Sequence, residues 1–321
     1  MKDYAFGIDI GGTTVKMGLF STKGEKIESW EIPTRKEESG AYILPDIAQA
    51  IKDKLAERSI SMDNVEGIGI DVPGPILQDR IVNRCVNLGW GVMDVAKELG
   101  MLIDIDNIKV ANDANAAALG EMWKGGGEGH TDLVMITLGT GVGGGVILNG
   151  KIVGGHFGAG GEIGHVLMNR FEEKPCACGK KGHLEQYTSA TGIVRRAKEI
   201  LAISDRPSTL RDLSEITAKD VFDQAQKGDV IALEIVDFVG AVLGGACAMI
   251  SCVVDPEIFV IGGGVSRAGD ILLSTVRKYF RSGVFHASED ARFALATLGN
   301  DAGMYGSVKM VIDAGSKAEN V

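Results

Sequence analysis

Short apolar runs that end in glycine or aspartate organise the first part of the chain. The runs YAFGIDI, VKMGLF and KIESWEI, separated by GGTT and by a TKG turn, predict three strands joined by tight turns. Apolar residues then recur at positions 44, 47, 51 and 55, a spacing that predicts a helix over 44–58. VEGIGIDV predicts a further strand that ends at the turn PGP, and NIKVANDANAAALGEMW predicts a strand that passes into a helix at Asn112-Asp113.

The pattern of strand, glycine-rich turn and strand then restarts. DLVMITLGTGVGGGVILNGKIVGG, residues 132–155, has the same arrangement as residues 3–27, so the sequence predicts an internal repeat and two similar lobes. Further on, EIFVIGGGVSRAGDILLSTVRKYF predicts a strand, a glycine turn and a helix, and residues 302–314 predict a helix that packs back on the first lobe. Strands that alternate with helices indicate the α/β class.

The two predicted lobes are not separated by a proline-, serine- or charge-rich linker. We therefore expect short crossings and a cleft between a smaller lobe, residues 1–112 with 301–321, and a larger lobe, residues 113–300. A chain of 321 residues is long enough for two such lobes, each with its own core.

Composition narrows the classes of function. The net charge is −10, which argues against a broad basic surface for nucleic acid. The N-terminus lacks the apolar core of a signal peptide. The apolar window Phe238–Val254 is short for a membrane span, so it predicts a buried helix that runs into a strand. Five cysteines, an odd number, without an export signal indicate a reducing cytoplasm and no membrane association.

Glycine is about twice as frequent as usual, with 45 residues, and it gathers in turns at the ends of apolar runs. Two of these turns would each present several backbone N–H groups and hydroxyls to one point, which suits an anion such as phosphate. They are Gly11-Gly12-Thr13-Thr14 and Gly139-Thr140-Gly141. The second turn also begins a G-x-G-x-x-G pattern, but a hairpin follows it and not the helix that a dinucleotide-binding fold requires.

Residues beside these turns extend the phosphate hypothesis. Asp9 precedes the first turn, where a carboxylate would hold hydrated Mg²⁺ beside a polyphosphate. Lys16 is either a phosphate contact or an ordinary surface residue of a strand. A third cluster, Gly262-Gly263-Gly264, ends an apolar strand and would let the flat ring of adenosine lie against the backbone. One cluster alone would be an ordinary tight turn, whereas three at strand ends favour nucleotide binding.

The loop PCACGKKGHLEQY, residues 175–187, places two cysteines one residue apart with His183 close behind. A disulfide, a redox pair and a metal site are each compatible with that spacing. A disulfide is the weakest of the three readings, because cysteines so close in sequence form a strained ring. Cys85, Cys247 and Cys252 have no such neighbours, and we expect them in the core.

Five motifs, taken together and in order, resemble a known family. They are DIGGTT from Asp9, NDAN from Asn112, LGTGVGGG from Leu138, GEIGH from Gly161 and the CxCGxxG loop. They resemble the repressor–open-reading-frame–kinase (ROK) family of sugar kinases, and VANDANAAALGEMWKG with GAGGEIGH is most similar to its bacterial glucokinases. The resemblance covers nearly the whole chain. It implies two ribonuclease-H-like lobes of the actin- and hexokinase-type ATPase fold with ATP in the cleft, and a homodimer.

The resemblance also implies roles in sugar binding. A kinase that acts on an alcohol needs a carboxylate within hydrogen-bond reach of the hydroxyl. From the residues alone Asp113 is equally well a helix cap or this base. The family's Asn-Asp motif places the catalytic aspartate at Asp113. It also implies that Asn112 binds a hydroxyl of the sugar. By the same resemblance the other sugar ligands are Glu162, His165 and Glu185, with backbone from Gly74.

In the family, three cysteines of the loop and the histidine of GEIGH hold a structural zinc ion. Here His183 stands where the family has its third cysteine, so the implied ligands are His165, Cys176, Cys178 and His183. Two sulfur and two nitrogen ligands suit tetrahedral zinc. The other reading is two inert thiols and a solvent-facing histidine. A closed zinc site would do no chemistry, but it would pin the loop so that Glu185 and the second ring nitrogen of His165 face the sugar.

The sequence therefore predicts ATP-dependent phosphorylation of a hexose at its 6-hydroxyl, with glucose the favoured substrate and with ATP, Mg²⁺ and structural zinc as cofactors. The alternatives within the enzymes are fructose, mannose and N-acetylmannosamine. From another class come a sugar-sensing repressor and a non-catalytic sugar-binding protein of the same family. A repressor would carry a helix-turn-helix before the kinase-like core, and the first phosphate turn already begins at Gly11, so we do not expect one.

Overall fold

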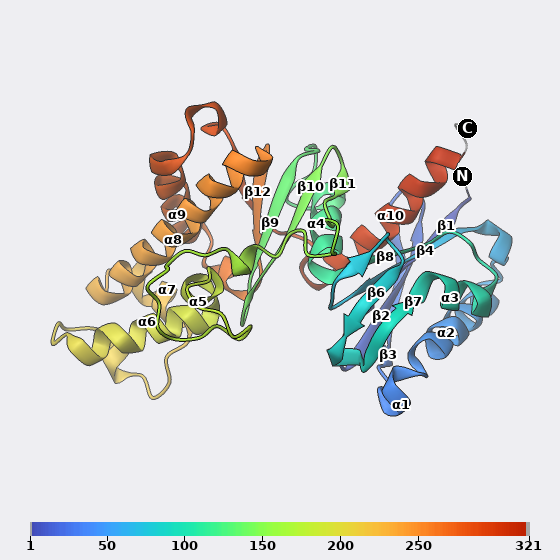
Figure 1. Cartoon of the computed structure of the whole chain (residues 1–321), viewed down its shortest axis with the longest axis horizontal. Coiled ribbons are helices and arrows are strands. Elements are labelled where there is room, and N and C mark those ends of the chain that lie inside the picture. The colour runs from blue at the N-terminus through green and yellow to red at the C-terminus, as the bar shows by residue number, and fades with distance from the viewer. Residues whose placement is uncertain (1, 319–321) are drawn as a thin grey trace. The chain divides into compact units, whose positions relative to one another are not determined.

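The computed structural model describes residues 2–318, which fold into two compact units (Figure 1). Unit 1 comprises Met1–Gly129, Gly145–Gly161 and Asn300–Val321, and unit 2 comprises His130–Gly144 and Glu162–Gly299. Strands and helices alternate along the chain, so the predicted α/β class is confirmed.

A five-stranded sheet with the order β3-β2-β1-β4-β8 forms the centre of unit 1. The first three strands in chain order pair antiparallel, and β4 and β8 run parallel to β1. A small antiparallel sheet of β5, β6 and β7 follows β4 in the chain. The bounds are β1 (Tyr4–Ile10), β2 (Thr14–Ser21), β3 (Lys26–Pro33), β4 (Val65–Val72), β5 (Ile76–Leu77), β6 (Ile81–Cys85), β7 (Trp90–Asp94), β8 (Ile108–Asn112), β11 (Lys151–Ile152), α1 (Glu37–Gly40), α2 (Ile43–Arg58), α3 (Val95–Ile103), α4 (Asp113–Lys124) and α10 (Ala302–Ala318).

Different helices cover the two faces of this sheet (Figure 1). Successive residues of a strand point to opposite faces, so Phe6 packs in a core with Ile47 of α2, while Ala5 packs with Met304 of α10. Helix α10 approaches the sheet so closely that a Cβ atom at Gly69 would lie 1.8 Å from the carbonyl oxygen of Ser307. The prediction that the C-terminal helix packs on the first lobe is therefore confirmed.

The packing of α4 explains why unit 1 is larger than the smaller lobe expected from the sequence. A Cβ atom at Gly306 would lie 1.8 Å from the carbonyl oxygen of Ala116, so only glycine lets α10 and α4 approach so closely. The strand β11 contacts α4 in turn. Residues 113–129 and 145–161 therefore group with unit 1, whereas the sequence had placed them in the larger lobe.

The second sheet repeats the topology of the first. Its order is β11-β10-β9-β12-β13, which matches β3-β2-β1-β4-β8 strand for strand, and the division between the units falls within β10. β12 runs parallel to both β9 and β13. The internal repeat predicted from the sequence is thus confirmed. The bounds are β9 (Leu133–Leu138), β10 (Val142–Leu148), β12 (Ile258–Gly262), β13 (Arg292–Leu295), α5 (Glu185–Thr188), α6 (Ala190–Ile203), α7 (Ala218–Gln226), α8 (Val230–Val254) and α9 (Asp270–Gly283).

Helix α8 is the longest helix of unit 2, with 25 residues, and it packs along α9. Asp229 caps its N-terminus by accepting the N–H groups of Ile231 and Ala232. By length and composition this one helix among the described residues could cross a membrane, but 56% of its most apolar window is buried inside the protein. The prediction of a buried helix that leads into a strand agrees with α8 followed by β12.

Candidate active site

Three aspartates gather at one edge of the sheet of unit 1. Asp9 near the end of β1 and Asp71 near the end of β4 are register partners, and Asp113 follows the last residue of β8. Carboxyl ends of neighbouring parallel strands meet at the same edge, which brings these side chains together. Asp71 is 1% exposed, and the hydroxyl of Ser307 donates to its Oδ2 at 3.0 Å.

Burial, and then the negative charges of Asp9 and Asp113, raise the pKa of Asp71 well above its usual range. Asp71 therefore keeps its proton to a higher pH than an exposed aspartate does. Asp71 is also the residue of this edge that sequence reasoning missed. A signal was present, because Gly69-Ile70-Asp71 repeats Gly7-Ile8-Asp9, and the structure pairs the two triplets residue by residue.

The first predicted phosphate turn is a tight loop between β1 and β2. The N–H of Gly11 donates to the carbonyl of Thr14 at 3.0 Å, and the hydroxyl of Thr34 donates to the carbonyl of Gly11 at 2.8 Å. Among residues 2–318, the amides of Gly12 and Thr13 have no protein acceptor. Such unpaired N–H groups at a turn are what an anion binds.

Lys16 lies beside this turn and is paired with Asp9. The two residues face each other across β1 and β2, with Lys16 Nζ 3.2 Å from Asp9 Oδ2. The lysine thus offsets part of the negative charge of the aspartate edge. Its predicted contact with phosphate stays a prediction.

The cap of α4 is Asn112 and not Asp113, for which the sequence left cap and base open. Asn112 is the N-cap of α4, since its Oδ1 accepts the N–H groups of Ala114 at 3.0 Å and Asn115 at 3.3 Å. Its Nδ2 donates to the carbonyl of Gly74 at 3.2 Å. Asp113 is exposed at the first position of α4, with one carboxylate oxygen on the Ala114 N–H at 2.8 Å. A carboxylate held in this way at a helix start can accept a proton from a bound alcohol.

The Pro-Gly-Pro turn beside Asn112 is fixed at all three carbonyls. Besides the bond from Asn112 to Gly74, the Cys85 thiol donates to the carbonyl of Pro73 at 2.9 Å, and the N–H of Asn83 donates to that of Pro75 at 2.9 Å. Cys85 and Cys247 are buried, as the sequence predicted, but the same prediction for Cys252 is wrong, because Cys252 lies on the exposed side of α8. The contact of Cys85 with this turn was not predicted, because it depends on the end of β6 folding back to the residue that follows β4.

Unit 2 carries the second predicted phosphate turn. The N–H of Gly139 donates to the carbonyl of Gly141 at 2.9 Å, and the amides of Thr140 and Gly141 find no acceptor within residues 2–318. The third glycine cluster lies at the end of the neighbouring strand β12. There Gly263 has φ +81°, and a Cβ atom would lie 2.5 Å from the carbonyl of Leu138, while Gly264 faces open space.

The four predicted metal ligands come together in unit 2. One ligand atom from each of His165, Cys176, Cys178 and His183 lies within 4.8 Å of the others. His183 Nδ1 is 3.2 Å from His165 Nδ1 and 3.3 Å from Cys178 Sγ. Tetrahedral zinc, with Zn–N bonds of about 2.0 Å, spaces ligand nitrogens about 3.3 Å apart, so the donor set fits this ion. Two ring nitrogens and two sulfurs also match its chemical preference.

The predicted sugar ligands of unit 2 surround this cluster. His165 turns Nδ1 toward the cluster and Nε2 toward Glu162, whose Oε2 is 3.9 Å away. Both residues are exposed on one 3₁₀ turn, with Glu162 directly before Ile163–His165. Glu185 lies instead with Oε2 on the N–H of Val142 at 3.0 Å and Oε1 3.3 Å from the Cys176 thiol.

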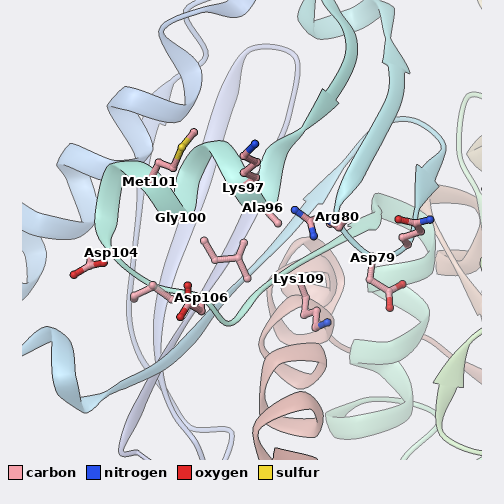
Figure 2. Close-up of a pocket in the computed structure, with 12 residues that line it drawn as sticks. Asp79, Arg80, Ala96, Lys97, Gly100, Met101, Asp104, Asp106 and Lys109 are labelled. Carbon is pink, nitrogen blue, oxygen red and sulfur yellow. The ribbon is translucent and has the colours of Figure 1, made fainter.

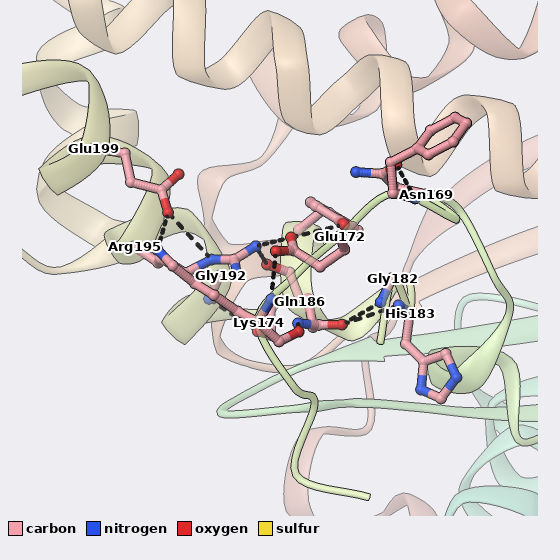
Figure 3. A network of polar contacts seen from close by, with 12 residues as sticks. Asn169, Glu172, Lys174, Gly182, His183, Gln186, Gly192, Arg195 and Glu199 are labelled. Atoms are coloured by element: carbon pink, nitrogen blue, oxygen red, sulfur yellow. Dashed lines mark hydrogen bonds and ion pairs between the residues drawn. The ribbon is translucent and has the colours of Figure 1, made fainter. Parts of the chain in front are cut away.

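A network of polar contacts, not predicted from the sequence, holds the loop of the cluster (Figure 3). The side chain of Gln186 accepts the N–H groups of Gly182 at 2.7 Å and His183 at 3.1 Å and donates to the carbonyl of Lys174 at 2.9 Å. Arg195 of α6 donates to Glu172 at 3.2 Å and to the carbonyl of Gln186 at 3.0 Å. The network therefore holds the loop on the side of α6, and the four predicted ligand side chains lie close enough together for one metal ion.

The volumes of the cavities do not by themselves identify the active site, because two cavities have similar volumes. A cavity of about 480 Å³ in unit 1 lies between α3, the turn of the β5–β6 hairpin and the start of β8 (Figure 2). Charged side chains of both signs line it, among them Lys97, Asp106 and Lys109, and none of the predicted site residues does. A cavity of about 460 Å³ in unit 2 is lined by the second phosphate turn, Cys176 and Glu185. The chemistry of the lining favours the second.

The fold defines a class: the phosphotransferases of the actin- and hexokinase-type ATPase fold. Comparison with known proteins agrees. The family model described as "ROK family" matches residues 5–314, and the chain belongs to the ROK family. The glucokinase of Halalkalibacterium halodurans is 44% identical over 94% of this chain and 92% of its own.

Solved structures of the family have the same fold. The ROK hexokinase from Thermus thermophilus gives a TM-score of 0.78 at 28% identity, covering 98% of this chain and 99% of that one. The ROK family glucokinase from Streptomyces griseus, solved in complex with glucose and AMPPNP, gives 0.70 at 31% identity, covering 96% and 98%. The predicted family and the predicted actin- and hexokinase-type fold are therefore confirmed.

Proposed function

We propose that this protein is an ATP-dependent kinase that phosphorylates the 6-hydroxyl of glucose. The observation that carries the proposal is the exposed carboxylate of Asp113 at the start of α4, on the same sheet edge as Asp9 and the first phosphate turn. A base for the alcohol and a turn for phosphate are the two parts that phosphoryl transfer needs from the protein. The similarity to glucokinases supports glucose as the acceptor.

In this mechanism Asp113 accepts the proton of the 6-hydroxyl as the sugar oxygen forms its bond to the γ-phosphorus of ATP. The bond between the γ-phosphorus and the bridging oxygen breaks, and ADP leaves with its electron pair. The free amides of Gly12, Thr13, Thr140 and Gly141 would bind phosphate oxygens. Asn112 holds α4 against the Pro-Gly-Pro turn, so it keeps Asp113 in place and has one N–H left for a sugar hydroxyl.

Two metal ions belong to the proposal. Mg²⁺ held by Asp9 would neutralise charge on the transferring phosphate when it is bound. Zinc held by His165, Cys176, Cys178 and His183 would be structural. With Nδ1 of His165 on the zinc side, its Nε2 stays on the side of Glu162, which suits both residues as ligands of one sugar.

The decisive experiment is a coupled assay of ADP release with a panel of hexoses. We expect glucose to give the highest kcat/KM among glucose, fructose, mannose and N-acetylmannosamine. A higher value for another hexose would reassign the substrate but keep the reaction. No ADP release with any of them, despite tight sugar binding, would favour a sugar-sensing protein.

We further propose that the protein is a homodimer in the cytoplasm and does not bind nucleic acid. Light scattering, which measures the mass in solution, tests the dimer.

A further inference from the structure

Glu185 lies between the metal cluster and the second phosphate turn. Its Oε1 is 3.3 Å from the sulfur of Cys176, and its Oε2 accepts the N–H of Val142 at 3.0 Å. The carboxylate is so close to the turn that a Cβ atom at Gly141 would lie 2.2 Å from Oε2. A single side chain thus contacts a residue of the cluster with one oxygen and the phosphate turn with the other.

The N–H of Val142 needs this acceptor. Val142 is buried at the start of β10, and a buried donor without a partner costs roughly 1–3 kcal/mol. The amides of Thr140 and Gly141, in contrast, have no acceptor among residues 2–318 and stay available for an anion. Glu185 therefore fixes the end of the turn without occupying the amides that would bind phosphate.

The segment that follows Glu185 holds the rest of the turn. The N–H of Ala190 donates to the carbonyl of Gly139 at 2.8 Å, and the hydroxyl of Thr191 donates to the carbonyl of Thr140 at 2.9 Å. The segment 185–191 thus contacts every residue from Gly139 to Val142. Two of the predicted metal ligands lie next to the start of this segment. Cys176 contacts Glu185, and His183 precedes Glu185 by two residues.

We propose that Glu185 is a positioning residue that couples metal occupancy to nucleotide binding. Cys176 and His183 would be fixed when they hold a metal ion, which would keep Glu185 against Val142 and order the second predicted phosphate turn for its ligand. The inference rests on the proposed role of that turn in binding ATP. The coupling predicts that loss of the metal weakens nucleotide binding even when sugar is absent. A role of Glu185 in sugar binding alone does not predict this effect.

The test is a calorimetric titration of Mg²⁺-ADP, without sugar, into zinc-loaded and zinc-depleted protein of measured zinc content. For the natural chain we expect depletion to weaken binding about tenfold, which is about 1.4 kcal/mol. Glu185→Ala should bind weakly in both states. Glu185→Gln should restore the zinc response, because its amide oxygen can still accept the N–H of Val142. Glu173→Ala removes an exposed carboxylate of the same loop and should keep the natural ratio.

The outcomes separate this inference from the proposed function. A dissociation constant that ignores zinc in the natural chain, or a zinc response that survives in Glu185→Ala, would overturn the coupling but leave nucleotide binding intact. Absence of any Mg²⁺-ADP binding to the zinc-loaded protein would overturn the nucleotide assignment itself and the coupling with it. Amide hydrogen exchange gives a second readout, since the N–H of Val142 should exchange faster in Glu185→Ala and after zinc depletion, and equal protection would contradict the proposal.

Discussion

The two units place different chemistry on the same sheet topology. In unit 1, Asp9 of β1 pairs with Asp71 of β4, and at the matching place in unit 2, Thr137 of β9 pairs with Gly262 of β12. Beside this pair, each unit has a turn with two amides that find no acceptor in the part of the chain that the structure describes. The repeat thus provides two turns that are predicted to bind phosphate, and the register position beside the turn holds two aspartates in unit 1 but Thr137 and Gly262 in unit 2. The carboxylates that we propose as the Mg²⁺ ligand and the base, Asp9 and Asp113, both belong to unit 1.

The turns also differ in what supports them. The first turn is held by Thr34, which directly follows β3, and by its own backbone. The second is held by Glu185 and Thr191, which follow the loop of the metal cluster. Perturbing the metal should therefore affect unit 2 and leave the aspartate edge of unit 1 in place.

The largest effect should come from removing the base at the charged edge. We expect Asp113→Asn to lower kcat by about 10²–10⁴-fold, because the amide cannot accept the proton of the alcohol. Glucose affinity should change little, since Asn112 still caps α4 and holds the Pro-Gly-Pro turn. Steady-state kinetics and a sugar titration measure both quantities. Asp106→Asn, an exposed aspartate at the other end of β8, is the matched control, and comparable losses in the two variants would remove Asp113 from the mechanism.

The next effect concerns the metal loop of unit 2. Cys178→Ser should lower the zinc content from about one ion per chain to well below half, because a hydroxyl is a poor zinc ligand. We also expect a fall of about 5 °C in Tm, as loss of a site worth 1–2 kcal/mol would give. Cys252→Ser is the control, since Cys252 is also an exposed thiol but lies on α8. Equal zinc content in the two variants would argue against the cluster as a metal site.

The repeated hairpins and the metal cluster were predictable from the sequence, because residues close together in the chain form them. Apolar runs and glycine turns predicted the repeated hairpins, and the helical spacing over 44–58 corresponds to α2 at Ile43–Arg58. The side chains of the metal cluster lie within 19 residues of one another, so the loop that brings them together is short.

The unpredicted contacts join residues that are far apart in the chain. Asp71 meets Ser307 of α10 across 236 positions, and Asp9 meets Asp71 only through the register of β1 on β4. Strand register and helix packing are tertiary properties that a single apolar run does not encode. The support of the metal loop by Arg195 depends on the docking of α6 for the same reason.

A third variant would convert the uncharged edge into a charged one. Thr137→Asp places a carboxylate in unit 2 at the position that Asp9 holds in unit 1. No lysine corresponding to Lys16 offsets it, because that place in β10 is taken by glycine. Like charges repel, so we expect the KM for ATP to rise about tenfold, with a smaller change in the KM for glucose. Thr137→Asn is the uncharged control, and an equal rise for both would mean that shape matters and charge does not.

The smallest effect, and the one that isolates the charged pair, is the pH dependence of stability at Asp71. Because its pKa is raised in the folded protein, the native state binds more protons than the unfolded chain between the ordinary aspartate pKa and the raised one. The free energy of unfolding should therefore fall as pH rises through that window.

The variant Asp71→Asn cannot ionise at this position, and its amide oxygen can still accept a hydrogen bond from the hydroxyl of Ser307. We expect this variant to be more stable than the natural chain at pH 7.5, by on the order of 1 kcal/mol, and to lose most of that advantage at pH 4. Urea unfolding at the two pH values measures the difference, with the exposed Asp104→Asn as control. Parallel profiles for the natural chain and Asp71→Asn would show that folding does not raise the pKa of the buried carboxyl.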